Sequence, residues 1–259
     1  MQRHSDMNTK KISVITVVFN GEKTISDTIE SVSSQDYSNI EHIIVDGAST
    51  DGTTALIEKQ KENISAFVSE RDNGIYDAMN KGVKLATGDL VGFLNADDIY
   101  AHSTVLSRVA DTFCKCNVDA CYGDLVYVRD DLSTIVRYYR SNIFSPEMLA
   151  YGWMPAHPTL FIKRELFYKY GGFKTDYEIA ADYEMVARLF WKHRIRYKYI
   201  PDVLVKMRMG GVSTSGVRSN YILSKEIVRA CKENDIRTSL PKVLLKYPLK
   251  IMELFTRPV

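Results

Sequence analysis

The sequence predicts an α/β protein whose core is a mostly parallel, doubly wound sheet with helices on both faces. Two observations favour this fold class. Apolar, β-branched runs alternate with segments of helical periodicity over roughly the first hundred residues, and turn formers separate them. Strands that are covered on both faces read as continuous apolar runs, and alternation at this interval favours right-handed crossovers between parallel strands.

The expected elements of this first part follow in a regular order. Residues 12–19 (ISVITVVF) are almost wholly apolar and predict the first strand, and Ile25, Ile29 and Val32 recur at helical spacing after the turn Asn20-Gly21. The same patterns predict strands at 41–46, 64–69 and 89–94 and helices at 53–61 and 75–87. Beyond residue 100 the alternation loosens, and we expect a helix at 103–113, strands at 120–128, 134–139 and 158–163, and a longer helix at 180–193.

The composition excludes several classes of protein. The chain has 259 residues with 34 Lys and Arg against 32 Asp and Glu, and the net charge of +2 is too small to indicate a nucleic-acid-binding protein. Its four cysteines show neither a zinc-ligand spacing nor the density of a disulfide scaffold, so we expect them to be reduced and structural. No run approaches the roughly 18 apolar residues of a spanning helix, and the first residues form no apolar leader. We therefore expect a cytoplasmic protein.

Acidic residues follow two of the expected strands directly. Asp46 comes after Ile43-Ile44-Val45, and Asn95-Ala96-Asp97-Asp98 comes after residues 90–94. In an open parallel sheet, ligands bind outside the carboxyl ends of the strands, so these side chains are expected to face a pocket. Carboxylates gathered at one edge repel each other unless a cation or hydrogen-bond donors are present. A nucleoside diphosphate with Mg²⁺ or Mn²⁺ would supply both.

Four stretches of the chain, taken in order, resemble a known family. They are ISVITVVFN, IIVDGASTDGT, GIYDAMNKGVKLATGDLVGFLNADD and EIAADYEMVARL. Over about residues 11–210 the chain is similar to the inverting nucleotide-sugar glycosyltransferases of family 2, which have the GT-A fold. The resemblance implies transfer of one hexosyl or N-acetylhexosaminyl group from a nucleotide-sugar donor, with UDP-sugars favoured, to a hydroxyl of a glycan or lipid-linked glycan in surface polysaccharide biosynthesis. The chain lacks a Gln-x-x-Arg-Trp signature, which argues against a processive synthase.

The resemblance also divides the chain. We expect a flexible segment at 1–10, a GT-A domain at 11–214 and a helical, basic and amphipathic extension at 215–259. Within the GT-A domain, 11–100 is the expected nucleotide-binding half and 101–214 the acceptor-binding half.

Donor contacts are implied for residues of the first half. Asp46 matches a position that contacts the base or ribose, and a carboxylate at a strand end can accept a hydrogen bond from a uracil N–H or a ribose hydroxyl. The alternative is a turn-forming aspartate before Gly47. The full set of expected nucleotide-binding residues is Val17, Phe19, Asn20, Asp46, Asp72, Asn80, Asn95 and Ala96.

The metal-binding motif departs from the family pattern. Asn95-Ala96-Asp97 stands where such enzymes usually have Asp-x-Asp, so the resemblance implies Asp97 as the ligand of Mn²⁺ or Mg²⁺ and leaves coordination by Asn95 open. Mg²⁺ needs only one or two protein carboxylates when it also binds phosphate oxygens. Asp98 is either a substitute ligand or a helix or turn cap.

The acceptor half supplies the expected catalytic base. Asp182 matches the family's base position, and a carboxylate there can take the proton of the acceptor hydroxyl on the face opposite the leaving diphosphate. The alternatives are a helix N-terminal acid without a catalytic role, or Glu178 or Glu184 as the base. His157, held between two prolines, and Trp153 are candidate acceptor contacts, and both are alternatively packed residues. A glycine-rich segment at 210–214 is a candidate for closing over the donor.

The C-terminal stretch combines basic and apolar residues. Lys242, Lys246 and Lys250 recur every fourth residue among apolar and aromatic side chains, which favours peripheral contact with an anionic membrane surface. Packing on the main domain or on another subunit explains the apolar residues equally well.

Two other functions use a similar set of residues. A sugar-nucleotide pyrophosphorylase also needs an α/β sheet, a metal and carboxylates, but Phe19-Asn20-Gly21-Glu22 lacks its glycine-rich, basic nucleotide loop. A noncatalytic nucleotide- or glycan-binding module would need Asp46 and Asp97 but no base.

Overall fold

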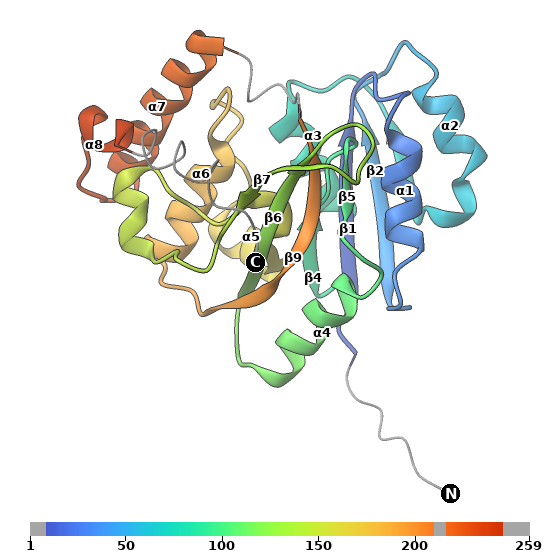
Figure 1. The fold of residues 1–259 in the computed structure, drawn as a ribbon, viewed down its shortest axis with the longest axis horizontal. Helices are drawn as coiled ribbons and strands as arrows, with labels where there is room; N and C mark the ends of the chain where they lie inside the picture. The colour runs from blue at the N-terminus through green and yellow to red at the C-terminus, as the bar shows by residue number, and fades with distance from the viewer. Residues whose placement is uncertain (1–8, 210–215, 246–259) are drawn as a thin grey trace, which may run out of the picture.

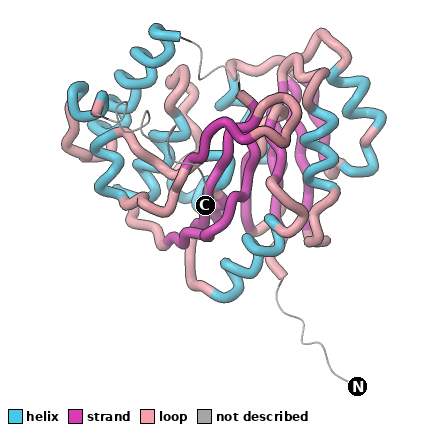
Figure 2. Tube along the Cα trace, viewed as in Figure 1, coloured by secondary structure: helices cyan, strands magenta, loops and turns pink. Residues whose placement is uncertain are grey.

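A nine-stranded sheet forms the centre of the molecule in a computed structural model that describes residues 9–209 and 216–245 (Figures 1 and 2). The strands lie in the order β3-β2-β1-β4-β8-β6-β9-β5, and β7 pairs with β6. Their bounds are β1 Ile12–Val18, β2 Ile40–Asp46, β3 Ala66–Ser69, β4 Leu90–Phe93, β5 Asp98–Tyr100, β6 Ala120–Val128, β7 Ile135–Tyr139, β8 Phe161–Lys163 and β9 Tyr197–Arg208.

The first four strands, β1 to β4, are all parallel to one another. β1 pairs in parallel with β2 and β4, and β2 with β3. β8 is antiparallel to both β4 and β6, so β6 and its parallel partner β9 run in the same direction as β1 to β4. β5 and β7 run in the opposite direction. The mostly parallel sheet expected from the sequence is therefore confirmed. The antiparallel strands β5, β7 and β8 all follow β4, in the part of the chain where the helical crossovers become irregular.

Helices cover both faces of the sheet, and β1 is therefore buried on both of its faces. Ile15 and Val17 face the cluster that contains Met79 of α3, whereas Val18 faces the cluster formed with α1 and α2. In Figure 1, α1 and α2 lie beside β1 and β2, and α6, α7 and α8 gather at the other side of the molecule. The helices are α1 Ile25–Ser33, α2 Thr53–Lys59, α3 Ile75–Leu85, α4 Val105–Lys115, α5 Glu165–Tyr170, α6 Ala181–Val186, α7 Gly216–Glu233 and α8 Leu240–Leu244, with short 3₁₀ turns at Lys61–Asn63, Pro146–Tyr151 and His157–Thr159.

α3 approaches β1 closely at one glycine. A Cβ atom on Gly82 would lie 2.4 Å from Cγ2 of Ile15, a distance that side chains do not tolerate without a shift. The absence of a side chain at this position therefore sets the spacing between α3 and the strand below it. The start of α3 is in turn what places residues 72–76 at the carboxyl edge of the sheet.

The long helix expected at 180–193 has two parts. α6 ends at Val186, and a π-helical turn, η4 (Ala187–Lys192), continues it. Asp98, for which the sequence left a cap or a ligand open, is instead the first residue of the short strand β5 and pairs with Met207. Three-residue strands such as β5 exist because of their partner strand and carry no periodic signal of their own.

The C-terminal helices pack on the main body. Val243 of α8 is fully buried, the Thr238 hydroxyl donates a hydrogen bond to the carbonyl of Ala150 (2.5 Å), and Lys242 Nζ lies 4.3 Å from the centre of the Tyr151 ring. For the described part of the extension, packing on the main domain accounts for part of its apolar surface. Among the described residues, no helix has both the length and the hydrophobicity that crossing a membrane requires.

Candidate active site

The carboxyl ends of β1, β2 and β4 open onto one edge of the sheet, and most of the predicted site residues lie there. The register pairs Val18 with Asp46 and Asp46 with Ser69, so three strands end at the same level. The loops that follow these strands hydrogen-bond to one another rather than to the core. Asn20 N–H donates to Ser49 Oγ (2.8 Å), and Asn20 Oδ1 accepts from Thr50 N–H (2.9 Å).

Asp46 is buried at the floor of this edge. Its Oδ2 accepts hydrogen bonds from Ser49 N–H (3.0 Å) and from the Ser69 hydroxyl (2.6 Å), and the Ser49 hydroxyl donates to Oδ1. The bond to residue 49 is the turn interaction that the sequence offered as the alternative role. Each carboxylate oxygen has further lone pairs, so the same contacts fix the orientation in which Asp46 can meet a ligand.

Phe19, Gly47 and Asp72 lie together just above Asp46. The Phe19 ring is 64% exposed although it follows a fully buried strand. A Cβ on Gly47 would lie 2.6 Å from Asp72 Oδ2 and 3.5 Å from Phe19 Cδ2, so only a glycine leaves this approach open. Asp72 Oδ1 accepts a hydrogen bond from Gly74 N–H (2.9 Å), which holds the carboxylate over the loop. An exposed ring beside a fixed carboxylate is a suitable surface for a nucleoside.

The segment after β4 carries two carboxylates in different surroundings. Asp97 is partly buried, and burial raises the pKa of its carboxyl group, while the nearby Arg208 guanidinium opposes that rise. Arg208, at the end of β9, does not bind the carboxylate, because its Nη1 donates to the main-chain oxygen of Asp97 (2.9 Å) and its Nη2 to Asp27. Asp98 is fully buried, its Oδ1 has no hydrogen-bond partner, and burial raises its pKa well above the ordinary value.

This donor set fits a divalent cation only in part. The described residues hold no group of three or more His, Cys, Asp or Glu side chains arranged to bind a metal ion. Within the described part of the chain no cationic side chain forms an ion pair with the Asp97 carboxylate, although the charge of Arg208 acts on it, and the Asn95 amide lies 3.5 Å from Asp98 Oδ2. One carboxylate and an amide suit Mg²⁺ or Mn²⁺ that is also bound by phosphate oxygens, and they do not suit a cation held by protein alone. Asp97 is therefore the residue that fits a shared metal.

Asp182 reaches the same edge from the second half of the chain. It is the second residue of α6, and its Oδ1 accepts a hydrogen bond from Tyr183 N–H (2.7 Å). Its other oxygen has no hydrogen-bond partner among residues 9–209 and 216–245. Burial raises the pKa of Asp182, and a charge on His157 would lower it.

His157 connects Asp182 to the end of β4. Its ring stacks on Phe93, the last residue of β4, with 5.6 Å between centroids. The ring is 8% exposed, and its buried Nε2 has no hydrogen-bond partner. The charges of His157 and Asp182 act on each other, and His157 stacks on Phe93, two positions before Asn95, so Asp182 lies near the end of β4.

Several residues singled out in the sequence have structural contacts instead. Glu184 is fully buried and forms ion pairs with Arg188 (3.0 Å) and Lys174 (2.9 Å), which removes it as a candidate base. The Asn80 amide donates to the carbonyl of Phe173 (2.8 Å) and accepts from its N–H (2.9 Å), so it joins α3 to the acceptor half. Trp153 is 6% exposed and packs against Tyr139 with 6.4 Å between ring centroids, as a core residue does.

Two residues near the site, Arg208 and Glu226, were not predicted from the sequence. Arg208 stands near Asp97 only because β9 pairs with β5, and Glu226 contacts the chain just before α6 from a helix far along the sequence. Neither residue belongs to a recognisable motif. The glycine-rich segment at 210–214 lies outside the described residues.

Two of the cavities along the described part of the chain differ in size and position. The smaller, about 370 Å³, lies between the start of α3 and residues 175–178, next to Tyr76, whose hydroxyl bonds to the carbonyl of Ile179 just before α6. The larger, about 750 Å³, lies at the amino-end edge of the sheet, because it is lined by residues that flank the start of β6 and β9.

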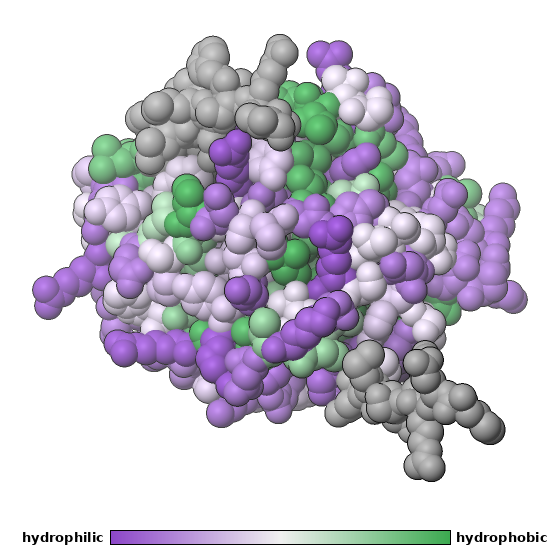
Figure 3. Space-filling model, turned by 60° about the horizontal axis from the view of Figure 1, so that its bottom comes forward, coloured by the Kyte–Doolittle hydropathy of each residue, from purple (hydrophilic) through white to green (hydrophobic). Residues whose placement is uncertain are grey.

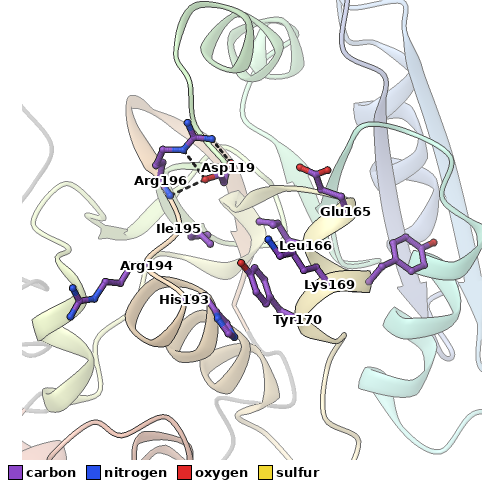
Figure 4. Close-up of a pocket in the computed structure, with 10 residues that line it drawn as sticks. Asp119, Glu165, Leu166, Lys169, Tyr170, His193, Arg194, Ile195 and Arg196 are labelled. Carbon is purple, nitrogen blue, oxygen red and sulfur yellow. Dashed lines mark hydrogen bonds and ion pairs between the residues drawn. The ribbon is translucent and has the colours of Figure 1, made fainter.

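The larger cavity is walled by charged and aromatic side chains. Figure 4 shows Asp119 and Arg196 facing each other across hydrogen bonds (2.8 and 2.9 Å), with Tyr170 stacked on His193 at 3.8 Å between centroids. The lower face of the molecule in Figure 1, turned forward in Figure 3, shows hydrophobic residues in small groups among hydrophilic ones. Neither candidate base nor metal ligand lines this cavity.

Comparisons with known proteins agree with this geometry. The sequence profile of the family described as Glycosyl transferase family 2 matches residues 13–190. An uncharacterized glycosyltransferase of Mycobacterium tuberculosis is 34% identical over 180 residues, which is 68% of this chain and 68% of that protein. A PGL/p-HBAD biosynthesis glycosyltransferase of Mycobacterium bovis is 29% identical over 222 residues, or 84% of this chain and 82% of its own length.

Solved structures share the fold at low sequence identity. S. aureus TarS 1-349 in complex with UDP-GlcNAc superposes on this chain with a TM-score of 0.67 at 20% identity. The matched region is 88% of this chain and 68% of the TarS chain. A mannosyltransferase from Pyrobaculum calidifontis in complex with GDP-Man and Mn²⁺ gives a TM-score of 0.59 at 20% identity, with coverage of 95% and 81%. The predicted GT-A arrangement with C-terminal helices is thereby confirmed.

Proposed function

This chain belongs to glycosyl transferase family 2, and from that premise we propose that it is an inverting, non-processive and metal-dependent transferase. It moves one hexosyl or N-acetylhexosaminyl group from a nucleoside-diphosphate donor to a hydroxyl group. One observation carries this proposal. His157, stacked on the end of β4, brings Asp182 to the sheet edge where Asp97 follows the same strand.

The donor occupies the carboxyl edge of β1, β2 and β4 in this proposal. The exposed ring of Phe19 and the carboxylates of Asp46 and Asp72 receive the base and ribose, and the main chain of Val17 to Asn20 and of Ala96 borders them. UDP-sugars are the favoured donors because a carboxylate accepts the N–H of uracil, and the UDP-GlcNAc complex of TarS, a neighbour in fold, agrees with that choice.

The diphosphate lies beside Asp97 and Asn95. These residues would hold Mn²⁺ or Mg²⁺ together with phosphate oxygens, and the mannosyltransferase neighbour was solved with Mn²⁺. When bound, the cation offsets the negative charge that develops on the leaving diphosphate. Asn95 in place of an acid makes the protein's share of the binding weaker, so metal and donor are expected to bind cooperatively.

Asp182 is the base of the proposed reaction. Its second oxygen accepts the proton of the acceptor hydroxyl. The oxygen of that hydroxyl attacks the anomeric carbon from the face opposite the diphosphate, and the bond from the anomeric carbon to the diphosphate breaks. A raised pKa makes the carboxylate a stronger base than an exposed aspartate. We assign to the buried Nε2 of His157, which has no hydrogen-bond partner among the described residues, a hydrogen bond to a second hydroxyl of the acceptor sugar.

Thermal shift with a panel of UDP-, dTDP- and GDP-sugars, each with and without Mn²⁺, tests donor binding, and hydrolysis of the stabilising donor tests chemistry. Asp97→Asn is expected to abolish the Mn²⁺-dependent part of both signals, because the carboxylate shared with the metal is lost. The matched control is Asp111→Asn on the exposed surface of α4.

The outcome separates this proposal from its rivals. Mn²⁺-dependent release of the nucleoside diphosphate that survives in Asp111→Asn but not in Asp97→Asn supports the transferase. Formation of pyrophosphate from a sugar phosphate and a nucleoside triphosphate would identify a pyrophosphorylase, and donor binding without turnover would identify a binding module.

The acceptor proposed is a glycan or lipid-linked glycan of a surface polysaccharide, met at an anionic membrane surface. The support is the basic stretch at Lys242, Lys246 and Lys250 together with relatives such as the PGL/p-HBAD biosynthesis glycosyltransferase. Of these lysines, Lys246 and Lys250 lie outside the described residues.

A further inference from the structure

A carboxylate on the C-terminal helix α7 binds the main chain immediately before α6. Glu226 Oε1 accepts the N–H of Glu178 (2.6 Å), and its Oε2 accepts the N–H groups of Ile179 and Ala180 (both 2.9 Å). Three consecutive main-chain donors therefore converge on one side chain that lies about fifty residues away in sequence.

These N–H groups belong to the part of the chain that introduces Asp182. The first N–H groups of a helix have no partner within it and need a cap. Ala180, at the N-cap of α6, offers no side chain for this purpose, and Asp182 bonds only the N–H of Tyr183. Glu226 thus binds, from another helix, the N–H of the N-cap residue Ala180 and the N–H groups of the two residues before it, which fixes the chain where it enters α6.

Further contacts between the same face of α7 and residues 174–177 continue this attachment. Glu233, two turns after Glu226, accepts hydrogen bonds from Lys174 Nζ (2.8 Å) and from the Tyr177 hydroxyl (2.9 Å). Arg229 lies between them, 4.2 Å from the centre of the Tyr177 ring, and pairs with Asp176. The chain that leads into α6 is therefore attached to α7 along its length.

We propose that Glu226 is a positioning residue for the glycosyl transfer, which fixes the direction of Asp182 by holding, from the C-terminal extension, the main chain of residues 178–180 that leads into α6. This inference rests on the proposed function, since it takes Asp182 as the base. It gives α7 a part in the reaction, whereas the sequence assigned the extension only to packing or to a membrane surface. Nothing in the local sequence around Asp182 points to this contact.

The charge of Glu226 also acts on Asp182. Three charged or titratable side chains of the described residues act on Asp182. They are His157 of the 3₁₀ turn at 157–159, Tyr76 of α3 and Glu226 of α7. The negative charge of Glu226 raises the pKa of Asp182, adding to the larger effect of burial. Removing it lowers that pKa, so the acid limb of kcat moves to lower pH.

The experiment compares Glu226→Gln with Glu226→Asp and Glu233→Gln in the full chain. In Glu226→Gln an amide NH₂ faces the N–H groups, so we expect hydrogen exchange at residues 178–180 to become about tenfold faster or more. We expect kcat to fall about 10- to 100-fold with the KM for donor unchanged, and the acid limb to shift to lower pH. Glu226→Asp keeps the charge but is one methylene shorter, so exchange rises without the pH shift.

Glu233→Gln is the matched control, because it loosens α7 from residues 174 and 177 and leaves the three N–H bonds intact. It should keep residues 178–180 protected and the acid limb in place. The proposal is overturned if Glu226→Gln retains wild-type exchange, kcat and acid limb, or if Glu233→Gln reproduces all of its effects. If the wild-type protein transfers no sugar at all, the proposed function fails. The exchange data alone then decide whether Glu226 holds the main chain of residues 178–180.

Discussion

Burial governs the chemistry of Asp182 more than any single charge does. It raises the pKa of the Asp182 carboxyl group, and it lowers the pKa of His157 beside it. A histidine with a lowered pKa is neutral near neutral pH, so its charge does not oppose the rise there. Asp182 acts as a base only in its ionised form, and near neutral pH the imidazole beside it is neutral and able to donate or accept a hydrogen bond.

Asp182→Asn should reduce transfer about 10²- to 10⁴-fold while donor affinity is retained, because the base is lost and the donor contacts are not. Initial rates with a donor and acceptor pair, together with donor thermal shift, measure both quantities. Glu178→Gln is the control, since Glu178 is an exposed carboxylate in the chain just before the same helix. Unchanged transfer by Asp182→Asn, or loss of transfer in Glu178→Gln, would remove Asp182 from the mechanism.

The pH dependence follows from the raised pKa. Only the ionised carboxylate accepts a proton, so kcat should fall as the pH drops through the pKa of Asp182 in the donor complex. Because burial raises that pKa, the fall should begin above the ordinary aspartate value of about 3.9. A profile of kcat at saturating donor and metal measures it, and a flat profile down to that value would contradict this account.

At the scale of elements, the junction between α6 and its π-helical continuation η4 depends on one buried arginine. Arg188 is 8% exposed, and its guanidinium donates to the carbonyls of Gly171 and Gly172 (both 2.7 Å) and to Glu184. Gly171 has a φ of 90°, a conformation that side chains rarely adopt. Arg188 thus joins the turn after α5 to the helix that carries Asp182.

Replacing Arg188 by methionine should destabilise the fold by about 3–5 kcal/mol, since Glu184 stays buried with one cation fewer and the three carbonyls of Tyr170, Gly171 and Gly172 lose their donor. Denaturant unfolding measures the change. Arg194→Met, at an exposed position just past the same helical segment, should change stability by less than about 0.5 kcal/mol. Equal stabilities of the two variants would show that the Arg188 contacts are not stabilising.

At the scale of the whole molecule, the two halves of the chain meet along the sheet and across its carboxyl edge. β8 joins β4 to β6, the Asn80 amide binds the main chain of Phe173, and the Tyr76 hydroxyl binds the carbonyl of Ile179. Donor and acceptor residues therefore occupy one rigid framework, to which α7 and α8 add a third layer of contacts.

The basic C-terminal stretch predicts a membrane-binding measurement. Changing Lys242, Lys246 and Lys250 to glutamine should weaken binding to phosphatidylglycerol vesicles about 100-fold, at roughly 1 kcal/mol per lysine near an anionic surface. Sedimentation with these vesicles and with neutral phosphatidylcholine vesicles measures it. A control triple change at Lys59, Lys61 and Lys84, which are exposed elsewhere, should leave binding unchanged. Equal binding of both variants, or no preference for anionic vesicles, would reject the membrane proposal.

Local sequence determined the first half of the fold almost completely. The apolar runs at β1, β2 and β4 predicted buried parallel strands, because a strand covered on both faces has to be apolar throughout. The acids that follow those strands predicted a ligand-binding edge. A carboxylate at the carboxyl end of a buried parallel strand faces outward from the core, where ligands bind in such sheets. Asp46, Asp97 and Asp182 were predicted from the segments in which they stand and from the resemblance those segments carry, and their roles stay predictions.

Only the tertiary structure decided which other residues serve that edge. Arg208 reaches Asp97 through strand pairing, and Glu226 reaches the start of α6 through helix packing. Conversely, Glu184, Asn80 and Trp153 are engaged in contacts with residues distant in sequence. Periodicity records which face of an element is buried, but a hydrogen bond between distant segments leaves no periodic trace in either of them. The sequence therefore predicted the chemistry proposed for the site, whereas the contacts that support it depend on the fold.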